Sequence, residues 1–486
     1  MSKTLLKKPI HTLLADSEKH GLKRTLGKTS LILLGIGAII GAGLFVRTAA
    51  ASAEAAGPAV TLSFIVAAVG CAFAGLCYAE FAAMFPIAGS AYTYAYTTMG
   101  ELVAWIIGWA LIMEYALGAA TVSIAWSEYL NNLLGGTIPY EWCHSPWETS
   151  VDGIRGIMNA PALVILLALT LLLIRGTQES AIVNGIIVFI KVGIVLAFIA
   201  IGFQFINSEN YTPYIVPETV PGHEDFFKHG WGGILRGAAI VFFAFIGFDA
   251  VSTAAQEAKN PQKDMPWGIL GSLVICTILY VLFAHVLTGV ANWQEFKLAG
   301  KEASVAYAIE HHMEGYSWLA TLVTVAILAG FSSVILVMLM GQSRVFFSMS
   351  HDGLIPPVFS KLHAKYKTPY KSNWILFVFV GLFAAFVPGH VAGDLTSFGT
   401  LLAFVLVCVG ILVLRKSNPE IKRPFKTPLV PLIPILGIAV CSFMIISLDH
   451  TTQFVALGWM LFGLCIYFGY GLAKSKLQQE HKKNQI

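Results

Sequence analysis

The first apolar stretch of the chain contains the run Ile36-Gly37-Ala38-Ile39-Ile40-Gly41-Ala42-Gly43-Leu44-Phe45 at its centre. Glycines at mid-membrane depth favour an interruption of the helix, and each backbone group left unpaired in hydrocarbon costs several kcal/mol. A broken span therefore persists only where it lines a cavity or meets a ligand. A similar interruption is predicted at Ala244-Phe245-Ile246-Gly247-Phe248-Asp249-Ala250. Paired broken helices in the two halves of a chain are typical of the binding site of a secondary transporter.

The composition indicates a polytopic membrane protein. Of the 486 residues, 56% are hydrophobic and 12% are charged, whereas soluble domains carry about 25% charged residues. Twelve nearly uncharged stretches predict twelve spans in an all-α membrane domain at 30–473, between an amino-terminal segment at 1–29 and a polar tail at 474–486 that we expect to be frayed. The stretches lie near 30–56, 60–84, 98–130, 158–175, 182–206, 231–255, 266–291, 316–343, 372–388, 395–414, 430–448 and 453–472.

The distribution of Lys and Arg predicts the orientation. With both termini in the cytoplasm, that side carries 24 basic residues and the opposite side carries six. We therefore expect a multi-pass protein of the cell membrane with both termini cytoplasmic. One basic residue, Lys191, lies inside the fifth span. The six outer residues are Arg47, Arg155, Lys228, Arg236, Lys297 and Lys301.

The order of the spans predicts an internal repeat. Spans 1 to 5 (about 30–206) and spans 6 to 10 (about 231–414) each begin with a broken helix. Because each repeat has an odd number of spans, the second copy is inverted relative to the first. Two further spans follow at about 430–472.

Four motifs resemble the amino acid, polyamine and organocation transporter superfamily, and specifically a bacterial member of its cationic amino acid transporter branch. His351 stands where that family usually has arginine, which puts one loop contact in doubt. The motifs are Gly35 to Phe45, Tyr78-Ala79-Glu80-Phe81 to Tyr92, Phe243 to Asp249 with Glu257 to Pro266, and Gly341-Gln342-Ser343-Arg344 with Asp352 to Pro356. The resemblance implies the LeuT-type five-plus-five inverted repeat, with an L-amino acid bound between the breaks in spans 1 and 6.

The chemistry of helix ends agrees with this binding site. Amide groups of Ala42, Gly43 and Leu44 at the start of a half-helix suit a carboxylate. Glycine at Gly41 and Gly43 allows the substrate to approach the backbone. Carbonyl groups that end the preceding half-helices suit an ammonium group, namely those of Ile39, Phe243, Ala244 and Ile246.

Two charged residues inside spans are further candidates. The resemblance places Glu114 at the substrate, and the alternative is a protonated glutamate bonded to another helix. Lys191 in span 5 is predicted to contact the break in span 1 and to couple transport to a proton. Burial disfavours its ammonium form, whereas carbonyl groups favour it. The alternative is a permanently charged tether that replaces sodium. Sodium coupling stays an alternative, because the hydroxyl groups of Ser332 and Ser333 in span 8 are possible sodium ligands at the same place.

Residues beside the breaks are candidates for gates and for a size filter. We expect Phe243 to cover the site from outside, and the resemblance places Asp249 with Tyr92 in a cytoplasmic gate. Asp249 is alternatively a helix cap. Met338 aligns with a position that lines the pocket, and its long side chain favours small neutral amino acids over arginine or lysine.

These features predict a permease that works by alternating access, as a proton symporter or as an exchanger. Less favoured alternatives are a channel and a sensor that binds without transport. The chain has no phosphate-binding loop and no recognisable set of nucleophile, base and orienting group, so we expect no enzyme. We expect no cofactor, no metal at Cys143-His144 and no nucleic-acid partner. The expected partners are the amino acid, a proton and membrane lipids.

Overall fold

The structure, a computed structural model, describes residues 6–9, 26–41, 43–85, 90–175, 180–217, 229–255, 258–297, 304–366 and 368–483. Within these ranges the regular structure is helical, apart from isolated bridges between Leu26 and Ala258 and between Thr149 and Arg155. Eight helical segments of the described chain are long and apolar enough to cross a membrane, and four shorter apolar helices accompany them. The expectation of an all-helical polytopic membrane protein is therefore confirmed.

The helices of the first half overlap the predicted apolar stretches, except that α5 lies almost wholly between two of them. Gly57, with φ +59°, and Pro58 separate η3 from α4, because a positive φ favours glycine and proline lacks the amide that a continuous helix needs. In chain order the elements are α2 (Lys28–Ile39), η2 (Gly43–Arg47), α3 (Thr48–Ala51), η3 (Ser52–Ala56), α4 (Val60–Met84), α5 (Ser90–Thr98), α6 (Glu101–Ile112), η5 (Met113–Leu117), α7 (Gly118–Leu133), α8 (Ala160–Arg175) and α9 (Ser180–Gly202).

The second half repeats the pattern of a short interrupted helix followed by long ones. Pro266 lies near the start of the 30-residue helix α12, where it interrupts few backbone hydrogen bonds. The elements are α10 (Gly230–Val241), η9 (Phe242–Phe245), α11 (Ala250–Thr253), α12 (Pro261–Val290), α13 (Ser304–His312), α14 (Ser317–His351), α15 (Tyr370–Phe386), α16 (Gly389–Ser417), α17 (Leu432–Ser447), α18 (His450–Ile466), η14 (Tyr467–Gly471), α19 (Leu472–Lys474) and α20 (Lys476–Lys483).

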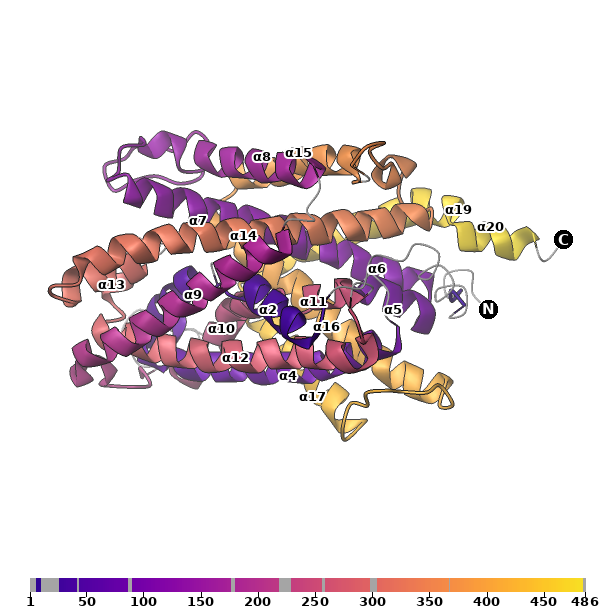
Figure 1. Cartoon of the computed structure of the whole chain (residues 1–486), viewed down its shortest axis with the longest axis horizontal. Helices are drawn as coiled ribbons and strands as arrows, with labels where there is room; N and C mark the ends of the chain where they lie inside the picture. Colours follow the sequence, from indigo (N-terminus) through magenta and orange to yellow (C-terminus); the bar gives the residue numbers. More distant parts are fainter. Residues whose placement is uncertain are drawn as a thin grey trace.

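The long helices run alongside one another in one bundle, with α8 and α15 on one side and α4 and α12 on the opposite side (Figure 1). α12 packs against both α4 and α2, and α14 packs against α7. α16 contacts α4, α6 and α7, so it joins the two sides. The short interrupted helices therefore lie among long helices that can satisfy their free backbone groups.

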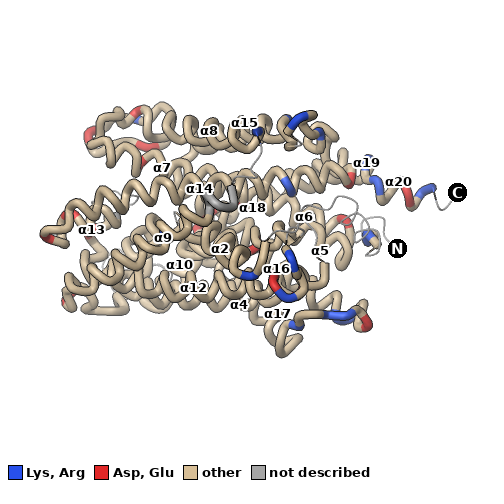
Figure 2. Tube along the Cα trace, viewed as in Figure 1, with Lys and Arg blue, Asp and Glu red and all other residues tan. Residues whose placement is uncertain are grey.

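Most charged residues lie near the ends of the bundle (Figure 2), and many large apolar side chains of its helices are exposed. Phe189 is 81% exposed and Phe454 is 73% exposed. Large exposed apolar side chains are costly in water but not in lipid, so this surface fits the hydrocarbon of a membrane.

Both ends of the chain meet at the same end of the bundle (Figure 1). The carbonyl of Leu6 accepts from the amide of Glu101, and the buried carboxylate of Glu101 accepts from the hydroxyl of Ser475. Within the tail, Lys476–Lys483 forms helix α20 and is not frayed as expected, because the hydroxyl of Ser475 and the side-chain amide of Gln478 donate to Glu101. Most of the amino-terminal segment at 1–29, namely residues 1–5 and 10–25, lies outside the described residues.

Candidate functional site

The first span is interrupted where the sequence predicts it. α2 ends at Ile39, Ile40 has an extended backbone with ψ 105°, and the chain becomes helical again at Gly43. The amide of Leu44, expected to be free for a carboxylate, donates to the carbonyl of Gly41 at 3.2 Å. Ala42 lies outside the described residues. Only part of the expected set of free amides is therefore available in this conformation.

The sixth span is interrupted over a longer segment. α10 ends at Val241, a 3₁₀ turn follows at Phe242–Phe245, and α11 begins at Ala250. Gly247 has φ +112°, which side chains disfavour, and a Cβ there would lie 2.8 Å from the carbonyl oxygen of Ala38. The residue must therefore be glycine for the turn to close against α2.

The two interruptions touch each other. A Cβ added at Gly43 would lie 2.1 Å from the Cα of Ala244, a distance that real Cβ atoms do not reach. The predicted substrate residues Ile39, Phe243 and Ile246 are buried around this contact. The backbones of the two broken helices thus meet face to face, as the sequence predicts.

Lys191 reaches the gap in the first span. Its Nζ atom donates to the carbonyl oxygens of Gly37 at 2.9 Å and Ile40 at 2.8 Å, and its side chain is buried. Its aliphatic stem lies against Gly330 of α14. The predicted contact with the break is present, while the role of Lys191 in proton coupling stays a prediction.

Tyr280 is a further residue at the two breaks, and the sequence alone does not single it out. Its hydroxyl lies 2.9 Å from the carbonyl oxygens of both Ile39 and Ala244, so one side chain of α12 bridges the two broken helices. A hydroxyl has one hydrogen to donate, so the two carbonyls share it. A buried tyrosine in an apolar span needs a hydrogen-bond partner, and this requirement was the available signal.

An acidic pair lies in the same interior. Glu114 belongs to the π-helical turn η5 and lies close to Asp249 and Thr400, while Asp249 accepts from the hydroxyl of Tyr115 at 2.8 Å. Among the described residues, neither carboxylate oxygen of Glu114 has a hydrogen-bond partner. A buried carboxyl group without a partner is costly, so this position suits a cation or a proton.

The predicted gate residues Tyr92 and Asp249 bind different partners in this conformation. Tyr92 donates to Asp352 at 2.8 Å, and Asp352 also forms an ion pair with Lys8 at 2.9 Å. Asp249 occupies the residue before α11 but makes no capping hydrogen bond with its side chain. Tyr92 is thus linked through Asp352 to Lys8 of the amino-terminal segment, and a gate formed by Tyr92 and Asp249 stays a prediction.

The second half of the first span carries an ion pair that the sequence does not predict. Arg47, counted among the basic residues of the outer side, ends the turn η2 with 6% exposure and pairs with Asp394 of α16. Its guanidinium carbon lies 6.0 Å from the centre of the Phe243 ring. Arg47 therefore lies inside the bundle, where its pairing with a carboxylate offsets part of the cost of burying its charge.

Met338 and Ser332 lie on the same helix, α14. The sulfur of Met338 would lie 2.8 Å from a Cβ at Gly118, so Met338 fills the space between α14 and α7. Ser332 donates to the carbonyl of Leu328 in its own helix at 2.9 Å. This hydroxyl is therefore engaged by its own backbone in this conformation.

The Cys143-His144 pair lies in a loop outside the bundle. Burial raises the pKa of the Cys143 thiol, which disfavours the thiolate that binds metals. His144 stacks on Tyr140 with ring centres 3.7 Å apart. Across the described ranges, no three metal-binding side chains of His, Cys, Asp or Glu come together.

Two broken membrane helices in contact, with buried polar groups around them, define a polytopic carrier rather than a soluble protein. The chain matches the amino acid permease family over residues 26–469 and belongs to this family. Its resemblance to the amino acid, polyamine and organocation superfamily is thereby confirmed.

Three relatives illustrate the range of names within the family. The branched-chain amino acid permease BcaP of Bacillus subtilis (strain 168) is 46% identical over 477 residues, covering 97% of this chain and 98% of that protein. The methylthioribose transporter of the same strain is 39% identical over 482 residues, covering 99% and 100%. The vacuolar cationic amino acid transporter 4 of Arabidopsis thaliana is 32% identical over 410 residues, covering 84% of this chain and 66% of that protein.

Proposed function

We propose that this permease is a secondary active transporter of L-amino acids that works by alternating access. The contact between Gly43 and Ala244 carries the proposal, because it joins two interrupted helices that can enclose a small zwitterion. In this proposal twelve spans form the LeuT-type five-plus-five repeat in the cell membrane. Both termini, which share one end of the bundle, face the cytoplasm.

Substrate binding uses the backbone at both breaks. Each carbonyl oxygen has two lone pairs, so the bonds from Tyr280 to Ile39 and Ala244 leave acceptor capacity for an ammonium group. The carboxylate lies at the start of the half-helix at Gly41 and Gly43. Leu44 would release its amide from Gly41 when the carboxylate enters, because the bond of 3.2 Å is a long one.

We propose that the substrates are neutral and small. Met338 fills space beside Gly118, which leaves less room than a small residue would. Two alternatives have specific support. The unpartnered Glu114 would accept a cationic side chain, and the relative named for branched-chain amino acids favours a larger apolar one.

We propose that Lys191 couples this transport to a proton. A neutral amine has two hydrogens, so it could satisfy both Gly37 and Ile40, and a charged one could do the same with one hydrogen remaining. Either protonation state is therefore compatible with the two hydrogen bonds. The alternatives are a permanently charged tether and an exchanger without proton coupling.

Transport assays in liposomes test these proposals. Purified protein would receive labelled alanine, leucine and arginine in separate experiments, each with and without an inward proton gradient. We expect gradient-driven accumulation of alanine. Uptake only into liposomes preloaded with amino acid would establish exchange instead, and binding without uptake would contradict transport. Stronger accumulation of leucine or arginine than of alanine would show that the substrate is not a small neutral amino acid.

A further inference from the structure

The segment 415–426 comprises the last three residues of α16 and most of its connection to α17. It is rich in basic residues and lies beside α17 at the edge of the bundle (Figure 2). We call it the basic loop. Its only acidic residue is Glu420. The basic residues are Arg415, Lys416, Lys422, Arg423 and Lys426.

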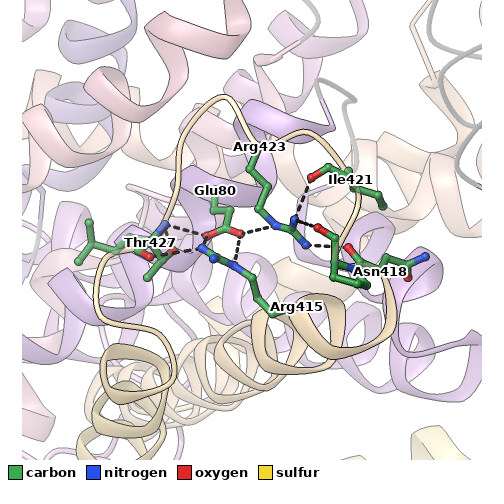
Figure 3. A network of polar contacts seen from close by, with 8 residues as sticks. Glu80, Arg415, Asn418, Ile421, Arg423 and Thr427 are labelled. Atoms are coloured by element: carbon green, nitrogen blue, oxygen red, sulfur yellow. Dashed lines mark hydrogen bonds and ion pairs between the residues drawn. The ribbon is translucent and has the colours of Figure 1, made fainter.

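A buried carboxylate holds the basic loop in place (Figure 3). Glu80, at 0% exposure, accepts from Arg415 Nε at 2.9 Å and Nη2 at 2.8 Å. It also accepts from the amide of Thr427 at 2.7 Å, and Arg423 Nε lies 3.3 Å from it. Because such charge-assisted bonds are short and directional, they fix the loop against the end of α4.

Arg423 also organises the loop from within. Its guanidinium donates to the carbonyls of Asn418 at 2.8 Å, Pro419 at 2.9 Å and Ile421 at 2.8 Å (Figure 3). The two arginines are thus engaged in holding the loop. The three lysines are different: Lys416, Lys422 and Lys426 are exposed and make no hydrogen bond or ion pair with the described residues.

The apolar surface next to the loop is also exposed. Leu429 has φ +45°, a conformation that is strained for leucine, and is 70% exposed. Leu432 and Ile435 follow at 51% and 49% exposure at the start of α17. An ordered basic loop therefore borders an exposed apolar helix.

We propose that the basic loop and the start of α17 form a binding surface for an anionic phospholipid in the leaflet on the side of the two chain ends. The lysine ammonium groups pair with the lipid phosphate, and the acyl chains lie along Leu429, Leu432 and Ile435. The arrangement suits a lipid, because a soluble anion would use the charge but not the apolar surface.

The test compares lipid-dependent thermal stability of the full-length protein in detergent. Added phosphatidylglycerol should raise the midpoint of unfolding more than phosphatidylcholine does. In the triple variant Lys416→Gln/Lys422→Gln/Lys426→Gln the concentration of phosphatidylglycerol needed for half of this effect should rise about tenfold or more. The matched control is Lys476→Gln/Lys482→Gln/Lys483→Gln on α20, which removes three exposed lysines outside the basic loop. It should retain the response.

A second variant separates lipid binding from folding. Leu429→Gly relieves the positive φ, so the protein without lipid should be at least as stable as the original. Loss of the apolar side chain should nevertheless weaken the response to phosphatidylglycerol. Equal losses in both lysine triple variants would overturn the proposal, since they would indicate unspecific charge. The proposal would also be overturned if inorganic phosphate raised the midpoint of unfolding as much as phosphatidylglycerol does. The same holds if phosphatidylglycerol stabilised Leu429→Gly as much as the original protein.

Discussion

The side-chain nitrogen of Lys191 lies 2.8 Å from the carbonyl oxygen of Ile40, the residue that follows the last helical turn of α2. Helix α9 therefore satisfies the backbone of the first break from the side. Tyr280 of α12 does the same for Ile39 and Ala244. Two neighbouring long helices thus compensate for the hydrogen bonds that the broken helices lack, which is what an interruption inside a membrane requires.

Replacement of Lys191 tests its proposed role in proton coupling. Lys191→Ala removes two hydrogen-bond donors to the first break, and we expect it to retain some substrate binding while uptake no longer depends on the proton gradient. Proton-driven and exchange uptake would be measured in the same liposomes. Accumulation that still follows the gradient would contradict the coupling role. Loss of gradient-driven uptake with exchange preserved would support it.

Tyr280→Phe tests whether the bridge between the breaks positions the substrate. The ring packs against Phe64 and Phe245, with ring centres 5.5 Å and 5.3 Å away, so phenylalanine should preserve the packing. Loss of one shared hydrogen bond is worth about 1 kcal/mol, so we expect the substrate concentration for half-maximal uptake to rise about fivefold.

The control for this variant is Tyr467→Phe, which removes a hydroxyl bonded to Glu101 at 3.0 Å at the end of the bundle where the chain ends meet. Tyr467→Phe should change the stability of the protein by about as much as Tyr280→Phe does, but it should leave the substrate concentration for half-maximal uptake unchanged. An equal rise in both variants would assign the effect of Tyr280 to general stability.

Met338→Ser tests the proposed size filter. The sulfur of Met338 occupies the space beside Gly118, so the shorter serine should admit larger side chains. We expect leucine and arginine to compete better with labelled alanine, by about tenfold, since each extra methylene that fits is worth about 1–3 kcal/mol. Ser332→Ala, on the same helix but bonded to Leu328, is the control. Competition profiles that match the original protein would exclude Met338 as a filter.

The sequence predicts the interruptions well because glycine content and hydrophobicity are local properties. Gly43 and Gly247 both lie where backbones come too close for a side chain. Partners across the bundle were harder to predict. The bond of Tyr280 to Ile39 joins residues more than 200 positions apart, and the ion pair between Arg47 and Asp394 joins residues more than 300 positions apart. Spacing along the chain carries no information about either contact. The pairing of Tyr92 with Asp352 depends in the same way on how α5 meets the end of α14.

The ion pair between Arg47 and Asp394 joins η2 of the first span to α16, and removal of one of the two charges should cost more stability than removal of both. Asp394→Asn leaves the buried guanidinium without its counter-charge, so we expect a loss of about 1–3 kcal/mol, reduced because Asp394 is 20% exposed. The double variant Arg47→Met/Asp394→Leu removes both charges and should recover most of that stability. Thermal unfolding of Arg47→Met, Asp394→Leu and their double variant in detergent gives the coupling energy of the pair. Additive losses would show that the two residues act independently, and the ion pair would then contribute nothing to holding η2 against α16.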